Sequence, residues 1–108
     1  MSDPPPVTSS QAVSKHALNH SILRHSLDVQ GASMEGETVL LDLNTGRYYT
    51  LNYLGSVIWE LCTGRNTISD IHAVLCDRFE VAPERALDDL VALISELVHE
   101  RLLHRETR

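Results

Sequence analysis

Six histidines and two cysteines are the residues of this chain whose types suit metal binding or nucleophilic chemistry. Two pairs have the i, i+4 spacing that places side chains on one helix face: His16 with His20, and His72 with Cys76. A zinc site needs three or four ligands, and neither pair has another ligand at a recognisable spacing. The pattern therefore favours surface histidines, and we expect no bound metal.

Catalysis by Cys76 with His72 would also need an orienting carboxylate and a loop of donors for an oxyanion, and the sequence indicates neither. Asp88 and Asp89 are adjacent, so on a helix they point about 100° apart and do not form a carboxylate pair. A glycine-rich phosphate loop and a dinucleotide fingerprint are both missing from the sequence. We expect no catalytic activity and no cofactor. A metal-binding or redox protein that uses Cys62, Cys76 and the histidines is one rival hypothesis.

The composition is that of one small globular domain. The chain has 108 residues, of which 43% are hydrophobic, and no apolar run approaches the roughly 18 residues that span a membrane. Its start carries three consecutive prolines but neither basic residues nor an apolar run, so we expect no secretory signal, a cytoplasmic location and two free thiols. The net charge of −6 disfavours a nucleic-acid partner and suits a basic or amphipathic peptide.

Turn residues divide the first half of the chain into short strands. Residues 1–20 are rich in Pro, Ser and Thr, and we expect a disordered or loosely helical arm before a folded domain at 21–105. The apolar pieces at 27–34, 38–43 and 47–51 predict three strands. Asn44-Thr45-Gly46 is typical of a hairpin turn, so these strands should form an antiparallel meander.

Helix signals follow the strands. Asn52 is a suitable N-cap for a helix over 53–62, and Thr67 with Asp70 predicts a capping box that opens a second helix. Pro83 suits the first turn of a third helix, which should run to about residue 100. The predicted fold class is α+β and winged-helix-like: a three-stranded antiparallel β-meander followed by three α-helices.

The third predicted helix has an apolar arc about 160° wide, which is more than one packing partner requires. One stripe can face the core while a groove beside Leu90, Leu93 and Leu97 stays open. Asp89 and Glu96 border that stripe and would give the groove an acidic rim. The alternative is that both apolar stripes are buried between the sheet and the other helices.

The strand at 47–51 offers a second binding feature, because a three-stranded meander leaves two edges with unpaired backbone groups. An extended peptide can add to such an edge as a further strand, while side-chain pockets supply specificity. A second copy of the chain can pair with the same edge, so a homodimer is also open.

Residues 39–52 read VLLDLNTGRYYTLN, and Gly55 and the segment IWEL at 58–61 follow. This stretch resembles the PqqD family, whose standalone members carry Leu-Asp-x-x-Thr-Gly-x-Tyr-aromatic-x-Leu-Asn. The resemblance continues through the second and third predicted helices and covers about residues 22–104.

The resemblance implies a recognition element whose third strand and third helix bind the leader of a ribosomally made precursor peptide. The candidate site residues, which include the acidic rim residues Asp89 and Glu96, are Arg47, Tyr48, Tyr49, Thr50, Leu51, Asp89, Leu90, Leu93, Ile94, Glu96 and Leu97.

Two kinds of partner enzyme are implied by the resemblance. The segment at 45–49 is most similar to proteins of lasso-peptide pathways, which present the precursor to a cysteine protease and a macrolactam synthetase. The pyrroloquinoline quinone pathway instead uses a radical-SAM enzyme. A winged-helix DNA-binding regulator is the rival from another class, and it is disfavoured because the second predicted helix offers only Arg78 as a basic residue.

Overall fold

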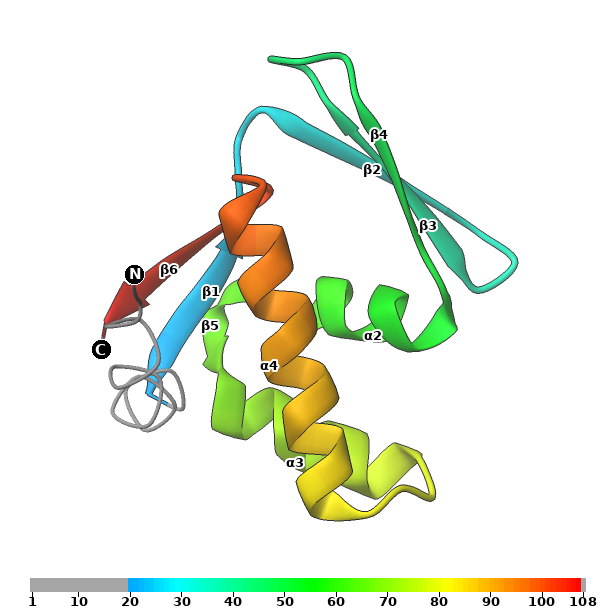
Figure 1. Ribbon diagram of the computed structural model, residues 1–108, viewed down its shortest axis with the longest axis vertical. Coiled ribbons are helices and arrows are strands. Elements are labelled where there is room, and N and C mark those ends of the chain that lie inside the picture. The colour runs from blue at the N-terminus through cyan, green and yellow to red at the C-terminus, as the bar shows by residue number, and fades with distance from the viewer. Residues whose placement is uncertain (1–19, 108) are drawn as a thin grey trace, which may run out of the picture.

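The computed structural model describes residues 20–107, and Figure 1 shows their arrangement. The predicted N-terminal arm lies outside these residues, apart from His20. Within the described range the elements, in chain order, are β1 (Ser21–His25), β2 (Val29–Met34), β3 (Glu37–Asp42), β4 (Tyr48–Leu51), α2 (Tyr53–Leu61), β5 (Thr63–Thr67), α3 (Ile68–Arg78), α4 (Pro83–His99) and β6 (Leu103–Thr107).

The predicted meander is present as an antiparallel sheet in the order β2-β3-β4. Its register pairs Leu40 with Tyr49 and Thr38 with Leu51. Strand alternation places Leu40 and Leu51 on the face that packs against the helices, where both are buried. The β3–β4 turn closes with Gly46 at a φ of 75°, the left-handed conformation that this turn requires.

A second sheet, in the order β5-β1-β6, was not among the predicted strands. Its central strand contributes Leu23, which is fully buried, and both outer strands pair with it in antiparallel fashion. The outer strands are short and polar: β5 reads TGRNT and β6 reads LHRET. Their strand conformation depends on pairing with β1 rather than on an apolar alternation of their own.

The three predicted helices are confirmed, together with their start signals. The side chain of Asn52 accepts a hydrogen bond from the Gly55 backbone at 2.8 Å and caps α2. Thr67 and Asp70 form both bonds of the capping box that opens α3. Pro83 is the first residue of α4.

Helix α4 runs down the middle of the view in Figure 1, with the β5-β1-β6 sheet on one side and α2 on the other. It buries the centre of its apolar arc: Ala86, Leu90, Ile94 and Leu97. Leu93 flanks this centre and is only half-buried. The arc therefore makes one core contact with half-buried margins, and it does not form two separate stripes.

Neither described cysteine is in a disulfide. Cys62 is fully buried, and burial raises the pKa of its thiol to about 12 because the charged thiolate is poorly solvated there. Cys62 thus serves as a small core residue. No helix in residues 20–107 combines the length and apolar content needed to cross a bilayer.

Candidate functional site

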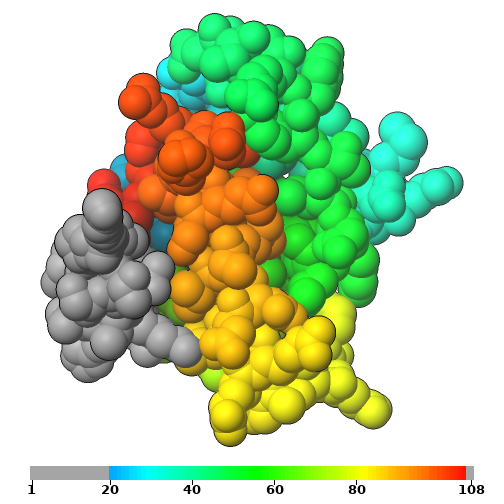
Figure 2. All heavy atoms as spheres, in the orientation of Figure 1, coloured from blue at the N-terminus to red at the C-terminus, as the bar shows by residue number. Residues whose placement is uncertain are grey.

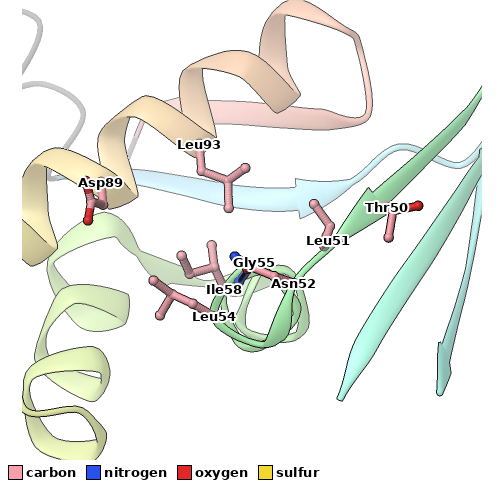
Figure 3. A pocket seen from close by; sticks show the side chains of 8 residues that line it. All are labelled: Thr50, Leu51, Asn52, Leu54, Gly55, Ile58, Asp89 and Leu93. Carbon is pink, nitrogen blue, oxygen red and sulfur yellow. Dashed lines mark hydrogen bonds between the residues drawn. The ribbon is translucent and has the colours of Figure 1, made fainter. Parts of the chain in front are cut away.

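A groove of about 440 Å³ lies where the end of β4, the first half of α2 and the middle of α4 meet (Figure 3). Figure 2 shows the surface of α4, in orange, bordering the green surface of β4 and α2. The groove is lined by Thr50, Leu51, Asn52, Leu54, Gly55, Ile58, Asp89 and Leu93.

The junction between β4 and α2 shapes one wall. Because Asn52 caps α2, the chain passes from strand to helix without an intervening loop. Gly55 suits this close passage, because a Cβ there would lie 3.3 Å from both the Asn52 side-chain oxygen and the Leu51 Cβ, which is closer than an ordinary van der Waals contact. The wall therefore presents Leu54 and Ile58 directly beside the last residue of β4.

The opposite wall comes from α4. Asp89 and Leu93 are four residues apart and lie on one side of that helix. Figure 3 shows Leu93 above the groove, between Leu51 of β4 and Ile58 of α2. Asp89 is exposed, and its carboxylate lies 3.7 Å from the Arg85 side chain in an ion pair. One half-buried leucine and one exposed carboxylate thus face the groove from this side.

The backbone of β4 forms an open edge beside the groove. The Asp42 N–H donates to the Arg47 carbonyl at 2.9 Å, which makes these two residues a hydrogen-bonded pair of the ladder. Because such pairs alternate along antiparallel strands, Tyr49 and Leu51 direct their backbone groups toward β3. The N–H and C=O groups of Tyr48 and Thr50 face away from β3, and within residues 20–107 no strand pairs with this edge.

Tyr49 connects β4 to the end of α4. Its hydroxyl donates to the Glu100 carboxylate at 2.9 Å, and the Arg47 guanidinium lies 3.8 Å from the same carboxylate oxygen. The guanidinium also lies 5.8 Å from the centre of the Tyr49 ring. These contacts hold the open edge at a set position relative to α4.

The hydrogen bond to Glu100 raises the pKa of the Tyr49 hydroxyl, and burial adds to this effect. The folded state thus keeps its phenol protonated to higher pH than the unfolded state does. The resulting stabilisation is complete below the ordinary tyrosine pKa of about 10 and is lost as pH rises through the raised value.

We expect Glu100→Gln to lower the pKa of the Tyr49 hydroxyl, as measured by phenolate absorbance against pH. A Tyr49 pKa that is the same in the variant and in the native protein would contradict the hydrogen bond to Glu100.

The structure brings some of the predicted site residues together and separates others. Thr50, Leu51, Asp89 and Leu93 line one groove, whereas Arg47 and Tyr49 lie at the Glu100 contact. Tyr48 is 69% exposed, and Glu96 is exposed outside the groove lining. The remaining three residues are core residues with little or no exposed surface: Leu90, Ile94 and Leu97. They occupy the buried centre of the α4 apolar arc and do not line the groove.

Four groove residues were not among the predicted site residues: Asn52, Leu54, Gly55 and Ile58. Leu54 and Ile58 fit the buried stripe of α2, so their periodicity indicates core packing. Leu54 is in fact half-buried, at the margin of that stripe. The sequence signal that could have indicated these residues is the Asn52 cap directly after Leu51. This cap starts α2 at the end of β4, so the first residues of α2 lie beside the end of the strand.

The chemical candidates do not form a reactive site in the described residues. The Cys76 sulfur lies 3.5 Å from His72 Nε2, and the same nitrogen lies 2.7 Å from the Pro83 carbonyl oxygen. A carbonyl oxygen only accepts, so Nε2 carries the proton and is not free to act as a base. Within residues 20–107 no three His, Cys, Asp or Glu side chains gather as metal ligands, and His16 lies outside this range.

The fold and the groove define a small α+β recognition domain with an open edge strand. A sequence family described as Coenzyme PQQ synthesis protein D (PqqD) matches residues 37–103, which is more than half of the chain. The chain belongs to the PqqD family. A comparison with curated protein sequences found no match.

Solved structures share this fold. The structure "TbiB1 in Complex with the TbiA(beta) Leader Peptide" has a TM-score of 0.70 and 31% identity over 75% of this chain and 94% of TbiB1. "Lasso peptide synthetase B1 complexed with the leader peptide" has a TM-score of 0.70 and 24% identity, covering 77% of this chain and 98% of its own. The heterocyclase TruD matches with a TM-score of 0.57 and 20% identity, over 79% of this chain and 11% of TruD. The last two likenesses concern the fold alone.

Proposed function

We propose that this protein is a non-catalytic adaptor that binds the leader segment of a ribosomally synthesised precursor peptide. The observation that carries the proposal is the open edge of β4 directly beside an apolar groove lined by Leu51 and Leu93. The family membership and the likeness to TbiB1, which was solved with a leader peptide, support it.

In this proposal the leader adds to β4 as a fourth strand of the meander. Tyr48 and Thr50 each offer an outward N–H and C=O, so they pair with alternate residues of the bound segment. Leader side chains on the helix-facing side then contact Leu54 and Leu93. Asp89 at the rim favours a Lys or Arg in the leader beside its apolar residues.

The adaptor would hand the bound precursor to a maturation enzyme. Lasso-type maturation, with a cysteine protease and a macrolactam synthetase, is favoured by the Thr-Gly-Arg-Tyr-Tyr segment at residues 45–49. Delivery to a radical-SAM enzyme is the alternative within the same family. Because precursor and enzymes are made by ribosomes in the cytoplasm, we place the adaptor there too.

A titration of the full chain with fluorescently labelled leaders tests this function. The probes are the N-terminal segments of peptides encoded by small reading frames beside this gene, and scrambled versions serve as controls. We expect one leader to raise the fluorescence anisotropy saturably, with a Kd near or below about 1 μM, as befits a specific peptide site. Binding of scrambled and native leaders with equal affinity, or of neither, would overturn the proposal.

A further inference from the structure

Strand β2 is a second open edge of the meander. It pairs with β3 on one side, and within residues 20–107 no strand pairs with its other side. The Leu43 N–H donates to the Asp28 carbonyl at 2.8 Å, which fixes the alternation of hydrogen-bonded pairs between β2 and β3. By this alternation, Gly31 and Ser33 direct their backbone N–H and C=O groups away from β3. These groups are available to a further strand.

This edge lacks the features that usually protect an open strand from pairing with another chain. Strand β2 reads VQGASM, so it carries neither a charged residue nor a proline. The two outer strands of the other sheet, by contrast, carry charges: Arg65 in β5, and Arg105 and Glu106 in β6. All residues of β2 after Val29 are exposed. A strand can therefore add to β2 without covering a charge of β2 itself.

A buried donor lies directly beneath this edge. Trp59 is 5% exposed, and a Cβ on Gly31 would lie 3.3 Å from its indole nitrogen Nε1. The His25 ring stacks on the indole with the centroids 3.7 Å apart, and His25 Nε2 lies 2.7 Å from the Trp59 carbonyl oxygen, so the indole is held in place. Among residues 20–107 no acceptor bonds the indole N–H. An unpaired buried donor is costly, so an acceptor brought beside Gly31 would be stabilising.

A second copy of β2 carries an acceptor at the right position. Two copies can pair antiparallel about a twofold axis at Ala32, which sets Ser33 of one copy opposite Gly31 of the other. Ser33 Oγ points to the helix-facing side, where it lies 3.0 Å from Oγ1 of the buried Thr38. Each Ser33 hydroxyl therefore lies on the same side of the joined sheet as the other copy's Trp59 and can accept its indole N–H. Symmetry makes this contact twice.

Pairing about this axis meets neither a steric nor an electrostatic obstacle. The three residues nearest the axis are small: Gly31, Ala32 and Ser33. Glu35 lies opposite Val29 of the other copy, so like charges do not face each other. The strand thus complements a second copy of itself, which is what a twofold interface requires.

We propose that β2 joins two copies of this protein, whose meanders form one continuous antiparallel sheet centred at Ala32. This goes beyond the proposed function, because the leader adds to β4 at the opposite edge of the meander and does not use β2. The dimer presents two leader-binding edges, one at each end of the joined sheet. One short strand per copy covers less than the standard interface of about 1,600 Å², so we expect a weak dimer with a Kd of about 100 μM.

Sedimentation velocity and NMR of the full chain test the dimer without any ligand. The protein is measured from tenfold below to tenfold above this Kd, and we expect the sedimentation coefficient to rise from that of a monomer to that of a dimer. Over the same range the Gly31 and Ser33 amides should become protected from hydrogen exchange, and the Trp59 indole N–H signal should shift. The Tyr48 and Thr50 amides should not change.

A pair of opposite charges at the axis tests both the partner and the register. Ala32 is exposed on the outer face of the sheet, so Ala32→Lys or Ala32→Glu should fold normally, as thermal unfolding checks. Each variant alone places like charges opposite each other and should dimerise more weakly than the native protein. An equimolar mixture of the two should dimerise about fivefold more tightly than either variant alone. The matched control is the mixture of Ala92→Lys with Ala92→Glu, exposed on α4, which should show no such preference.

Three results would overturn the proposal. The protein may stay monomeric at the highest concentration, or it may form a dimer that protects Tyr48 and Thr50 while Gly31 and Ser33 exchange freely. The third is a mixture of the two Ala32 variants that dimerises no more tightly than each variant alone. None of these results depends on the leader, so the dimer and the leader-binding function stand or fall separately.

Discussion

Leu93→Glu is expected to lower the affinity for the leader by about a hundredfold, which corresponds to about 3 kcal/mol. Leu93 faces the groove between Leu51 and Ile58, so a bound peptide would cover a carboxylate placed at this position. Covering a charge without a partner is costly, and the apolar contact is lost as well. In the free protein the half-buried position lets the new carboxylate reach water, so stability should change little. Anisotropy titration measures the affinity and thermal unfolding the stability.

Ala92→Glu is the matched control for this change. Residue 92 is the neighbour of Leu93 on α4 and is exposed, and it does not line the groove. The control adds the same charge to the same helix, so any general effect of charge on a basic leader appears in both variants. Equal loss of affinity in the two variants would contradict a contact made by Leu93 itself.

Thr50→Pro is expected to weaken leader binding about tenfold or more while the meander stays folded. The Thr50 N–H faces the open edge, so proline removes a donor available to the leader and puts its ring where the added strand would lie. The β3–β4 ladder uses Tyr49 and Leu51 instead and keeps its bonds. One lost hydrogen bond accounts for about 1 kcal/mol, and the steric effect of the ring adds to it.

Thr50→Val is the control for the edge prediction, because it removes the hydroxyl but keeps the backbone N–H. Its affinity should match that of the native protein in the same titration. The prediction for proline fails if Thr50→Pro binds as tightly as Thr50→Val, or if both variants lose affinity together. Equal affinity of the two variants would argue against strand addition at β4. A loss of affinity in both would indicate that the leader contacts the Thr50 hydroxyl and not its backbone N–H.

Local signals explain which parts of the fold could be predicted. Gly46 in the turn, the Asn52 cap and the Thr67 capping box each depend on residues a few positions apart, and the structure contains all three. Strands β5 and β6 lack such signals. Their pairing with β1 joins Ile22 to Thr67 and to Glu106, residues far apart in the chain, so their conformation follows from the tertiary fold.

The candidate site was predictable in part for a similar reason. Helical periodicity placed Leu93 in the apolar arc of α4, but it could not show which residues lie at the buried centre of that arc and which lie at its margin. Leu90 and Leu97 proved to be core residues. Which side of the arc faces the core depends on where α2 and β1 pack. The α2 wall of the groove, with Leu54, depends on the same packing and on the strand-to-helix corner at Asn52.

Amide hydrogen exchange at the β4 edge tests strand addition most directly. In the free protein the Tyr49 and Leu51 amides bond to β3, whereas those of Tyr48 and Thr50 face outward. Residue-resolved NMR exchange with and without a saturating leader should show the Tyr48 and Thr50 amides becoming strongly protected, with little change at Tyr49. A leader that binds tightly but leaves Tyr48 and Thr50 exchanging at their free rates would contradict the account.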